Sequence, residues 1–127
     1  MGAIFSLDHT ILLVRNQAES VEFYRQVMGF GHEGKAGPFE VMRINTGFTL
    51  DLLQQAPADP VHLAFSVDPA TFDAVHKRLI QHNIPFGGDT FQRDGRIAAN
   101  PFGARGMADA LYFYDPDRHN LELRVYR

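Results

Sequence analysis

The stretch LYFYDPDRHNLELRVY, residues 111–126, contains two short apolar runs separated by a turn. Both runs have the aromatic and aliphatic composition of strands, and residues 115–120 between them are rich in Asp, Pro and Asn, which favour turns. Because side chains alternate between the two faces of a strand, the leucines of the second run lie on one face and Glu122 on the other. A carboxylate between two leucines is an unusual place for a solvating charge.

A second copy of this pattern occurs in the first half of the chain. The run FTLDLL, residues 48–53, places Asp51 between two leucines, as Glu122 is placed. Another strand-like run, residues 39–44, comes before it, and the Asn-Thr-Gly sequence at 45–47 predicts the turn that joins the two. Asp51 and Glu122 are therefore expected to occupy equivalent positions of a repeat.

Each half of the chain also begins with an apolar run that contains one histidine. His9 lies within FSLDHTILLV, residues 5–14, and His62 lies within PVHLAFSV, residues 60–67. Their composition predicts a strand for each run. Taken singly, each histidine is more often a hydrogen-bonded core residue than a ligand. Because two histidines and two carboxylates repeat together, chance is a poor explanation for the set.

A helical pattern follows each of these two strands. Residues 16–29 carry apolar side chains at helical spacing and reach Gly29, which predicts a C-terminal stop. Asp68 and Pro69 predict the start of the second helix, with Asp as the N-cap and Pro at the first helical position. The apolar stripe expected for this helix consists of Phe72, Val75, Leu79 and Ile80.

The repeat predicts an α+β fold built from two βαβββ modules. The modules span residues 5–54 and 60–127, and we expect residues 1–127 to form one domain because no linker or low-complexity tract separates them. A chain of this length can bury a core without disulfides or metals. The second module contains a long segment, residues 87–109, rich in Gly, Arg and Phe, and long segments of this kind are often functional.

The repeated histidines and carboxylates predict a metal site. If the modules pack about a pseudo-twofold axis, all four side chains converge on one point. Imidazole suits Zn, Ni, Co and Fe, and carboxylates add charge. Two histidines with one or two carboxylates leave open positions, which mark a catalytic site rather than a closed structural one. We therefore expect one divalent ion (Ni, Zn, Co, Mn or Fe) held by His9, His62, Glu122 and Asp51.

Four further side chains are candidates for contact with a substrate. Tyr112 is expected to face the predicted site, and Arg43, Arg105 and Arg124 are candidates for binding an anionic group. Arg105 lies on the long segment that could cover the site. Arg124 shares a face with Glu122, so its alternative role is to pair with that carboxylate. For each arginine, a solvated surface charge is the other interpretation.

The composition excludes several classes of function. The 127 residues include no cysteine, which excludes disulfides, thiolate nucleophiles and cysteine-ligated metal centres. With a net charge of −3 and no cluster of lysine and arginine, the sequence predicts no nucleic-acid partner. No apolar stretch is long enough to span a bilayer, and the first residues do not resemble a signal peptide. We expect a cytoplasmic protein without a membrane partner.

Four motifs, taken in chain order, point to a known family. They are Asp8-His9, FYRQVMGF at residues 23–30, His62-Leu63-Ala64-Phe65, and YFYDPDRHNLEL at residues 112–123. Together they resemble the vicinal oxygen chelate superfamily, which comprises glyoxalase I, fosfomycin-resistance, bleomycin-resistance and extradiol dioxygenase proteins. The resemblance covers nearly the whole chain and depends on the order and spacing of the motifs.

The resemblance implies two βαβββ modules whose mixed sheets curl into a cup-shaped half-barrel around the metal, with the helices packed outside. It places His9, His62 and Glu122 on the family's metal positions. Asp51 falls where glyoxalase I enzymes carry a fourth ligand, which is usually Glu. The resemblance also implies a homodimer, in which a site can be shared between chains, and a small-molecule substrate.

The sequence departs from the family pattern at two points. Asp51 is one methylene shorter than Glu, so its direct ligation of the metal stays open. Arg118 stands where the family often has Gly, in a turn that is expected to need a positive φ, a conformation that arginine tolerates poorly. His119, beside it, is expected to be a turn residue rather than a ligand.

The resemblance leaves three functions open. The first is a glyoxalase-type lyase or thiol transferase, in which the metal is a Lewis acid and Glu122 or Asp51 moves a proton or remains a ligand. The second is an extradiol-type dioxygenase with Fe(II) on two histidines and one carboxylate. The third is a non-catalytic drug-binding protein, which needs no metal. Asp51 favours the first, so a metal-dependent enzyme of that kind is our expectation.

Overall fold

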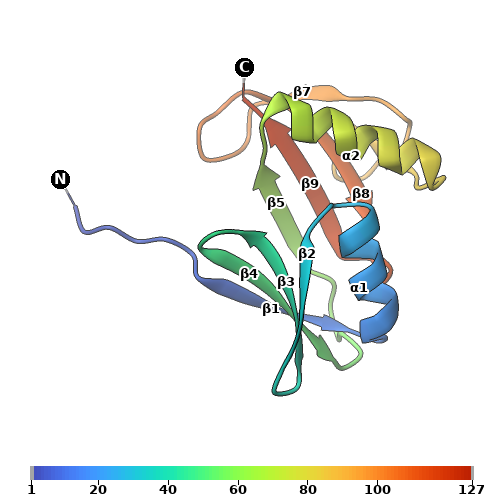
Figure 1. Ribbon diagram of the computed structural model, residues 1–127. Coiled ribbons are helices and arrows are strands. Elements are labelled where there is room, and N and C mark those ends of the chain that lie inside the picture. The colour runs from blue at the N-terminus through green and yellow to red at the C-terminus, as the bar shows by residue number, and fades with distance from the viewer. Residues whose placement is uncertain (1, 127) are drawn as a thin grey trace. The chain divides into compact units, whose positions relative to one another are not determined.

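The computed structural model describes residues 2–126, which belong to two compact units, Met1–Ala58 and Asp59–Arg127. Each unit contains one helix and one mixed sheet, of four strands in the first and five in the second (Figure 1). The predicted α+β class is confirmed. No described helix is long and apolar enough to cross a membrane. That the two modules form a single domain stays a prediction.

Unit 1 has the element order expected of a βαβββ module. Its elements are β1 (His9–Val14), α1 (Gln17–Gln26), β2 (Gly31–Ala36), β3 (Phe39–Asn45) and β4 (Phe48–Gln54). The strands lie in the order β1-β4-β3-β2. β1 runs parallel to β4, and the other neighbours are antiparallel.

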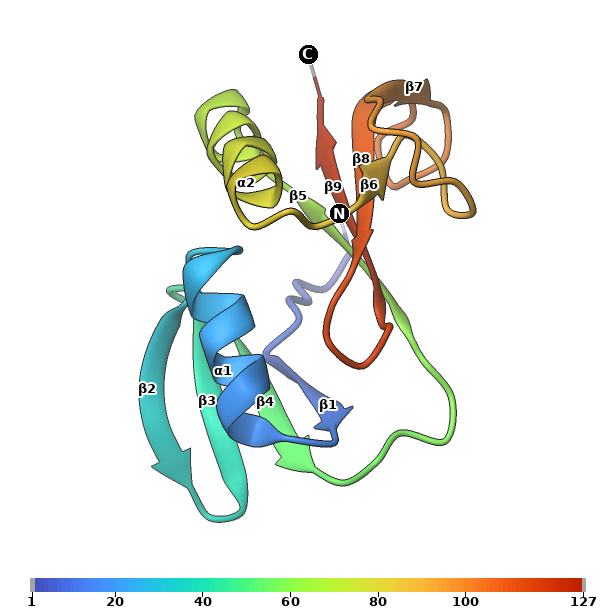
Figure 2. The ribbon, with the colours of Figure 1, turned by 90° about the vertical axis from the view of Figure 1, so that its right-hand side faces the viewer.

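The two faces of the unit 1 sheet differ in composition, as the alternation in β4 predicts. Leu50 and Leu52 are fully buried on the face that α1 covers, together with Met42 from β3 (Figure 2). Asp51 lies on the opposite face because its side chain alternates with theirs. The helix therefore stabilises one side of the sheet and leaves the other side free for the candidate ligands.

Helix α1 is shorter than the predicted segment, residues 16–29. Asn16 is its N-cap, and the Oδ1 atom of Asn16 accepts a hydrogen bond of 3.0 Å from the Glu19 amide. The helix ends at Gln26, with Val27 as the C-cap. Gly29 has a φ of 79°, so the predicted stop occurs where glycine permits the left-handed conformation.

Unit 2 repeats this architecture and adds one short strand. Its elements are β5 (His62–Ser66), α2 (Pro69–Gln81), β6 (Phe86–Gly87), β7 (Ala98–Asn100), β8 (Ala108–Tyr114) and β9 (Asn120–Val125). The order β5-β9-β8-β6 is that of unit 1, and β7, inside the long segment, pairs with β8. β5 runs parallel to β9.

Helix α2 begins at Pro69, as predicted, and buries Phe72, Val75 and Leu79. The expectation that Ile80 belongs to this stripe is wrong, because its side chain is 57% exposed. Successive helical residues are rotated by about 100°, so the residue after Leu79 points away from the face that Leu79 buries.

Four strands differ from the predicted pattern. β1 begins at His9 rather than at residue 5, because its parallel partner begins at Phe48, directly after the turn at 45–47. β2 was not predicted, since its sequence GHEGKA is polar and exposed and lacks apolar alternation. β6 and β7 are too short to produce a period in the sequence.

The sequence repeat is also a repeat in strand register. The pairs are His9↔Thr49 and Ile11↔Asp51 in unit 1, and His62↔Asn120 and Ala64↔Glu122 in unit 2. In both units the carboxylate lies two residues further along the parallel pair than the histidine. Since directly paired residues project to the same side of a sheet, each histidine shares a face with its carboxylate.

Candidate metal site

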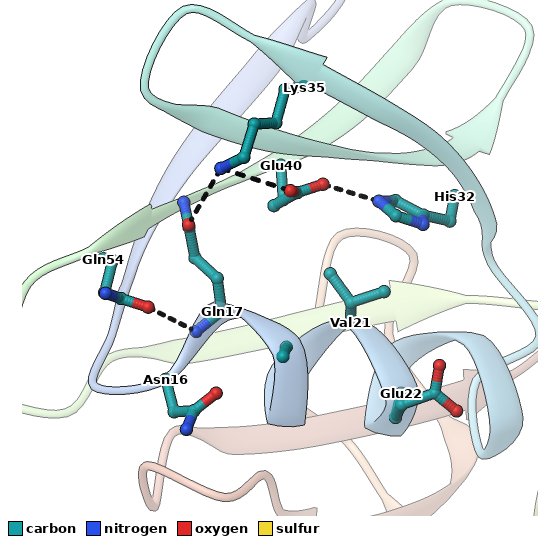
Figure 3. A pocket seen from close by; sticks show the side chains of 9 residues that line it. Asn16, Gln17, Val21, Glu22, His32, Lys35, Glu40 and Gln54 are labelled. Atoms are coloured by element: carbon teal, nitrogen blue, oxygen red, sulfur yellow. Dashed lines mark hydrogen bonds and ion pairs between the residues drawn. The ribbon is translucent and has the colours of Figure 1, made fainter.

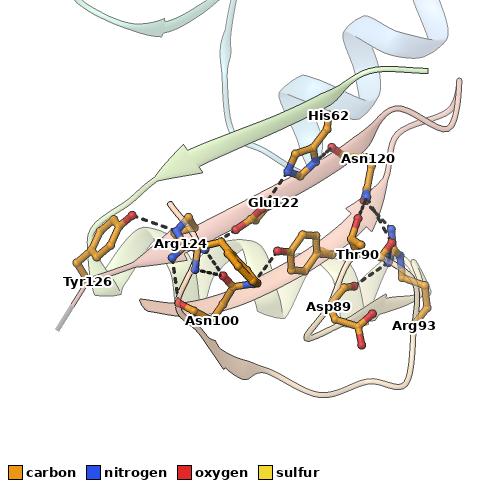
Figure 4. Close-up of polar contacts among 11 residues, drawn as sticks. His62, Asp89, Thr90, Arg93, Asn100, Asn120, Glu122, Arg124 and Tyr126 are labelled. Carbon is orange, nitrogen blue, oxygen red and sulfur yellow. Dashed lines mark hydrogen bonds and ion pairs between the residues drawn. The ribbon is translucent and has the colours of Figure 1, made fainter. Parts of the chain in front are cut away.

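His62 and Glu122 form the best-defined part of the candidate site. The Nε2 atom of His62 lies 3.0 Å from the Oε1 atom of Glu122, and the Nδ1 atom of His62 lies 2.8 Å from the main-chain oxygen of Asn120 (Figure 4). β5 and β9 bring the two residues together, because their parallel register places His62 diagonally across from Glu122.

These two distances determine which atom of His62 is available for chemistry. A carbonyl oxygen only accepts hydrogen bonds, so Nδ1 carries the proton and donates it to Asn120. In a neutral imidazole, Nε2 then presents a lone pair to the carboxylate of Glu122. Two acceptors this close need a proton or a cation between them. Imidazoles that bind metals are oriented in this way, by donating the second ring N–H to a carbonyl or carboxylate.

The second oxygen of Glu122 is already occupied. The Nη1 atom of Arg124 donates to Oε2 of Glu122 over 2.7 Å, and each residue is only 4% exposed. Of the two roles considered for Arg124, pairing with this carboxylate is the one that the structure shows. Glu122 therefore presents one oxygen toward His62 and gives the other to an arginine.

Tyr112 packs beside this pair. Its ring stacks on the imidazole of His62 with centroids 6.0 Å apart, and its hydroxyl accepts a hydrogen bond of 2.8 Å from Asn100. Burial, followed by the negative charge of Glu122, raises the pKa of Tyr112 to about 12. The hydroxyl is thus protonated at neutral pH, and a hydrogen bond to Glu122 acts in the same direction on its pKa.

Unit 1 carries the other predicted histidine, with a similar arrangement of its ring. The Nδ1 atom of His9 lies 2.7 Å from a carboxylate oxygen of Asp8. This hydrogen bond raises the pKa of His9, and the charges of Asp51 and Asp8 act in the same direction. With Nδ1 held by the neighbouring carboxylate, Nε2 is the nitrogen left for ligation.

Asp51 has an incomplete set of hydrogen bonds. Its Oδ1 atom is buried and has no partner within the described part of the chain. An unpartnered buried carboxylate oxygen is costly, and such atoms are often explained by a missing ion or by a catalytic role. The position thus fits a ligand or a proton acceptor, the two roles considered for it.

The two remaining arginine candidates already have partners. Arg43 pairs with Glu33 at 3.0 Å on the sheet face that carries Asp51. Arg105 donates to the hydroxyl of Ser66 over 3.1 Å, and its guanidinium lies over the ring of Tyr126. Their role in substrate binding stays a prediction.

Two pockets, one in each unit, have none of these candidate ligands in their lining. In unit 1 a pocket of about 470 Å³ lies between α1 and the sheet, where Glu40 is held by His32 at 2.6 Å and by Lys35 at 3.3 Å (Figure 3). Glu40 pairs with Leu52, so this pocket is on the helix-covered face, opposite Asp51. In unit 2 a pocket of about 500 Å³ follows residues 88–102.

Two partners of the candidate site were not predicted. Asn100, from β7, donates to Tyr112 and accepts from Arg124, but it lies in the long segment, where no period marks it. Asp8 belongs to a quoted motif, yet its hydrogen bond to His9 follows only from the coordinates.

Each unit thus presents two of the four predicted ligands on one sheet face. Among residues 2–126, no group of three or more His, Cys, Asp or Glu side chains is assembled as a metal site. The donor types and orientations nevertheless fit a divalent ion. In unit 2, Nε2 of His62 points at Glu122, and Glu122 has one oxygen that Arg124 does not occupy. In unit 1, Oδ1 of Asp51 has no hydrogen-bond partner among the described residues.

Comparisons with known proteins identify the family of this chain. It belongs to the Glyoxalase/Bleomycin resistance protein/Dioxygenase superfamily, whose model matches residues 6–123. Over 126 residues it is 25% identical to "Metallothiol transferase FosB" of Lysinibacillus sphaericus (strain C3-41), covering 94% of this chain and 82% of that protein. The predicted resemblance to the vicinal oxygen chelate superfamily is confirmed.

Two solved structures illustrate the range of similar proteins. "Oxidase ChaP-H2" is 29% identical, with a TM-score of 0.85 over 98% of this chain and 96% of that one. The fosfomycin resistance protein FosX from Mesorhizobium loti is 21% identical, with a TM-score of 0.68 over 98% and 95% of the two chains. The second likeness shows a shared fold alone. The named relatives include enzymes of two reaction classes, a transferase and an oxidase.

Proposed function

We propose that this protein is a metal-dependent enzyme of the glyoxalase type, a lyase or thiol transferase that acts on a small molecule bearing oxygen atoms. In this proposal His9, His62 and Glu122 hold a divalent cation, and Asp51 is a fourth ligand or a proton acceptor. A cation bound there supplies a Lewis acid that polarises an oxygen of the substrate. The similarity to a metallothiol transferase supports the transfer reaction.

The orientation of His62 toward Glu122 gives the most direct support for the proposal. His62 aims Nε2 at Oε1 of Glu122 over 3.0 Å while its Nδ1 proton is committed to Asn120. The contact needs a proton or a cation between Nε2 and Oε1, and a divalent cation held by both atoms meets this need. The repeated register that relates His62 and Glu122 to His9 and Asp51 extends the same chemistry to unit 1.

The protein's own groups have distinct tasks in this proposal. Tyr112, protonated at neutral pH because its pKa is raised to about 12, turns its hydroxyl proton from Glu122 to negative charge that develops on the substrate. Asp51 uses its unpartnered Oδ1 to accept a proton from the substrate. Glu122 orients the cation and moves no proton, since Arg124 occupies its second oxygen.

The test is a titration of metal-free protein with Co(II), followed by its visible absorption. We expect wild type to bind Co(II), and His62→Ala or Glu122→Gln to weaken binding by more than about 100-fold, because each removes a direct ligand. His82→Ala is the control, since His82 is exposed at the end of α2. Equal affinity in wild type and both ligand variants would exclude this site.

A second function is favoured by a separate observation. The 29% identity with a structure named as an oxidase, together with two histidines and one carboxylate, supports an Fe(II)-dependent reaction with dioxygen. Oxygen uptake by the Fe(II)-loaded protein on catechols, compared with its Ni(II)-loaded form, separates this candidate from the first. Uptake that depends on Fe(II) and is lost in His62→Ala favours the oxidase; no uptake favours the lyase or transferase.

A drug-binding protein without metal, the third function considered, predicts that the ligand variants do not affect binding. Such a protein keeps its affinity for a small molecule when His62 and Glu122 are replaced and when chelator is present. We propose instead that substrate binding requires the metal, and that the protein acts as a homodimer in the cytoplasm. Size-exclusion chromatography with light scattering tests the dimer.

A further inference from the structure

We propose that Arg124 is the positioning residue of Glu122: it holds one carboxylate oxygen, so that only the other is presented to a cation, and it ties this orientation to the loop at residues 101–107. The inference rests on the proposed function, since it assigns the way in which one metal ligand is aimed. It concerns contacts within unit 2 alone (Figure 4).

Every N–H group of the Arg124 guanidinium has a hydrogen-bond acceptor. Its five N–H groups have five acceptors: Glu122 Oε2 and Asn100 Oδ1 for Nη1, the main-chain oxygens of Asn100 and Gly106 for Nη2, and the Tyr126 hydroxyl for Nε. The guanidinium therefore has one orientation that satisfies every donor. Arg124 is 4% exposed, so water cannot readily replace these partners.

The second step concerns the carboxylate itself. A glutamate carboxylate can bind a metal with one oxygen or with both. Here the 2.7 Å hydrogen bond from Arg124 occupies Oε2, while Oε1 lies 3.0 Å from Nε2 of His62. Rotation of the carboxylate to offer both oxygens would leave a buried guanidinium donor unpaired, which is costly. Arg124 thus favours binding through a single oxygen.

The third step links this orientation to the loop. Arg124 holds the main-chain oxygen of Asn100, directly before the loop, and that of Gly106, within the loop. Gly103 packs directly on the guanidinium. A Cβ atom at Gly103 would lie 2.6 Å from Nε of Arg124 and 2.8 Å from the Tyr126 hydroxyl. The close approach therefore requires glycine, because a Cβ atom at this position would displace the guanidinium.

The experiment measures Co(II) affinity and the intensity of the visible Co(II) bands, which reports the coordination number. We expect Arg124→Gln to weaken binding by about 10–100-fold, the usual effect of removing a partner that orients a ligand. The Co(II) spectrum should also change as Glu122 becomes free to use both oxygens. Arg124→Lys keeps the positive charge and should recover part of the affinity.

A second variant leaves both charges in place. Gly103→Ala displaces the guanidinium without removing it and should weaken Co(II) binding in the same direction. Gly95→Ala is its matched control, because Gly95 also has a positive φ, of 79°, but has open space at the Cβ position. Thermal unfolding of the metal-free proteins is measured in parallel, so that lost affinity is not confused with lost fold.

The outcomes separate the two proposals. If wild type and Gly95→Ala bind Co(II) and the Arg124 and Gly103 variants bind more weakly with altered spectra, the inference holds. If Gly103→Ala folds and binds as wild type does, with an unchanged spectrum, Arg124 does not position Glu122, even where Arg124→Gln fails to fold. If wild type binds no Co(II), the proposed function fails and the inference fails with it.

Discussion

At the scale of single residues, His62 illustrates how a neighbouring group directs a side chain. Its Nδ1 proton is held by the main chain of Asn120, so the reactive nitrogen is chosen before any ligand binds. Strand composition was sufficient to nominate His62 as a candidate. Its tautomer follows from the 2.8 Å contact with an atom 58 positions further along the chain.

Arg118 provides a second test at this scale. The sequence predicted a positive φ in its turn, and the structure has a φ of 63° there. Its guanidinium lies over the ring of Tyr114, 4.2 Å from the centroid. Since the backbone is strained for any residue with a Cβ, we expect Arg118→Gly to be more stable than Arg118→Ala by about 1 kcal/mol.

Arg78, inside α2, serves as the matched control for this comparison. There the order should reverse, and Gly should be less stable than Ala by about 1 kcal/mol, because glycine disfavours helix. Urea denaturation of the four variants measures both differences. Equal stability of Gly and Ala at position 118 would contradict the strained turn.

Glu40 yields a prediction about pH. The hydrogen bond from His32, followed by the one from Lys35, lowers the pKa of the Glu40 carboxyl in the folded protein. A lowered folded pKa gives stability that is present above the unfolded pKa, about 4.3, and is lost as pH falls through the folded value. Glu40→Gln should therefore lower the free energy of unfolding at pH 5.5 and have little effect at pH 2.5.

The size of this effect is limited because His32 is partly exposed. We expect a loss of about 1 kcal/mol or less at pH 5.5, measured by denaturant unfolding at both pH values. Glu19→Gln is the control, since Glu19 lies on the exposed side of α1 and outside this pair. A cost of Glu40→Gln that is equal at both pH values would show that the ion pair does not contribute.

At the scale of elements, the order of helices and strands follows closely from the sequence pattern. Both helices and the longer strands have clear periods, and Pro69 and Gly29 lie where their conformations predict a start and a stop. β2 escaped prediction because an exposed edge strand needs no apolar alternation. It forms because β3 offers an unpaired edge, which is a property of the sheet rather than of residues 31–36.

Gly87, at the junction of β6 with the long segment, lies very close to the main chain of that segment. A Cβ atom at Gly87 would meet the main chain of Gln92 and would lie 3.0 Å from Cα of Arg93. We expect Gly87→Ala to destabilise the protein by about 1–3 kcal/mol through overpacking. Gly47→Ala, in a turn with open space at its Cβ position, should cost much less. Thermal unfolding of both variants measures this; similar melting temperatures would contradict the close approach.

At the scale of the whole molecule, the proposed metal site can be formed by the two units of one chain or by units of two different chains in a dimer. Each unit presents one histidine and one carboxylate on the face that its helix does not cover. Ile11, paired with Asp51 on that face, is 50% exposed. The resemblance implies a homodimer, and if the proposed site is shared between its chains, unit 1 of one chain completes the site with unit 2 of the other.

Mixing two defective variants tests this expectation. His9→Ala and His62→Ala should each fail to bind Co(II) tightly. After they are unfolded and refolded together, a shared site would restore about a quarter of the wild-type sites, because half of the dimers are mixed and one of their two sites is intact. No recovery would show that both units of the site belong to one chain. Wild type mixed with His62→Ala should keep half of the wild-type sites in either arrangement, so it gives the reference for the yield of refolding.

The sequence by itself determined the repeat, the strands that carry His9, His62, Asp51 and Glu122, and the face on which each carboxylate lies. These properties are local, because strand alternation and helical spacing act over a few neighbouring residues. The tertiary structure decided which atoms of those side chains are free: Arg124 takes one oxygen of Glu122, and Asn100 reaches Tyr112 from the long segment. Contacts of this kind depend on loop paths that have no period, so only the folded chain specifies them.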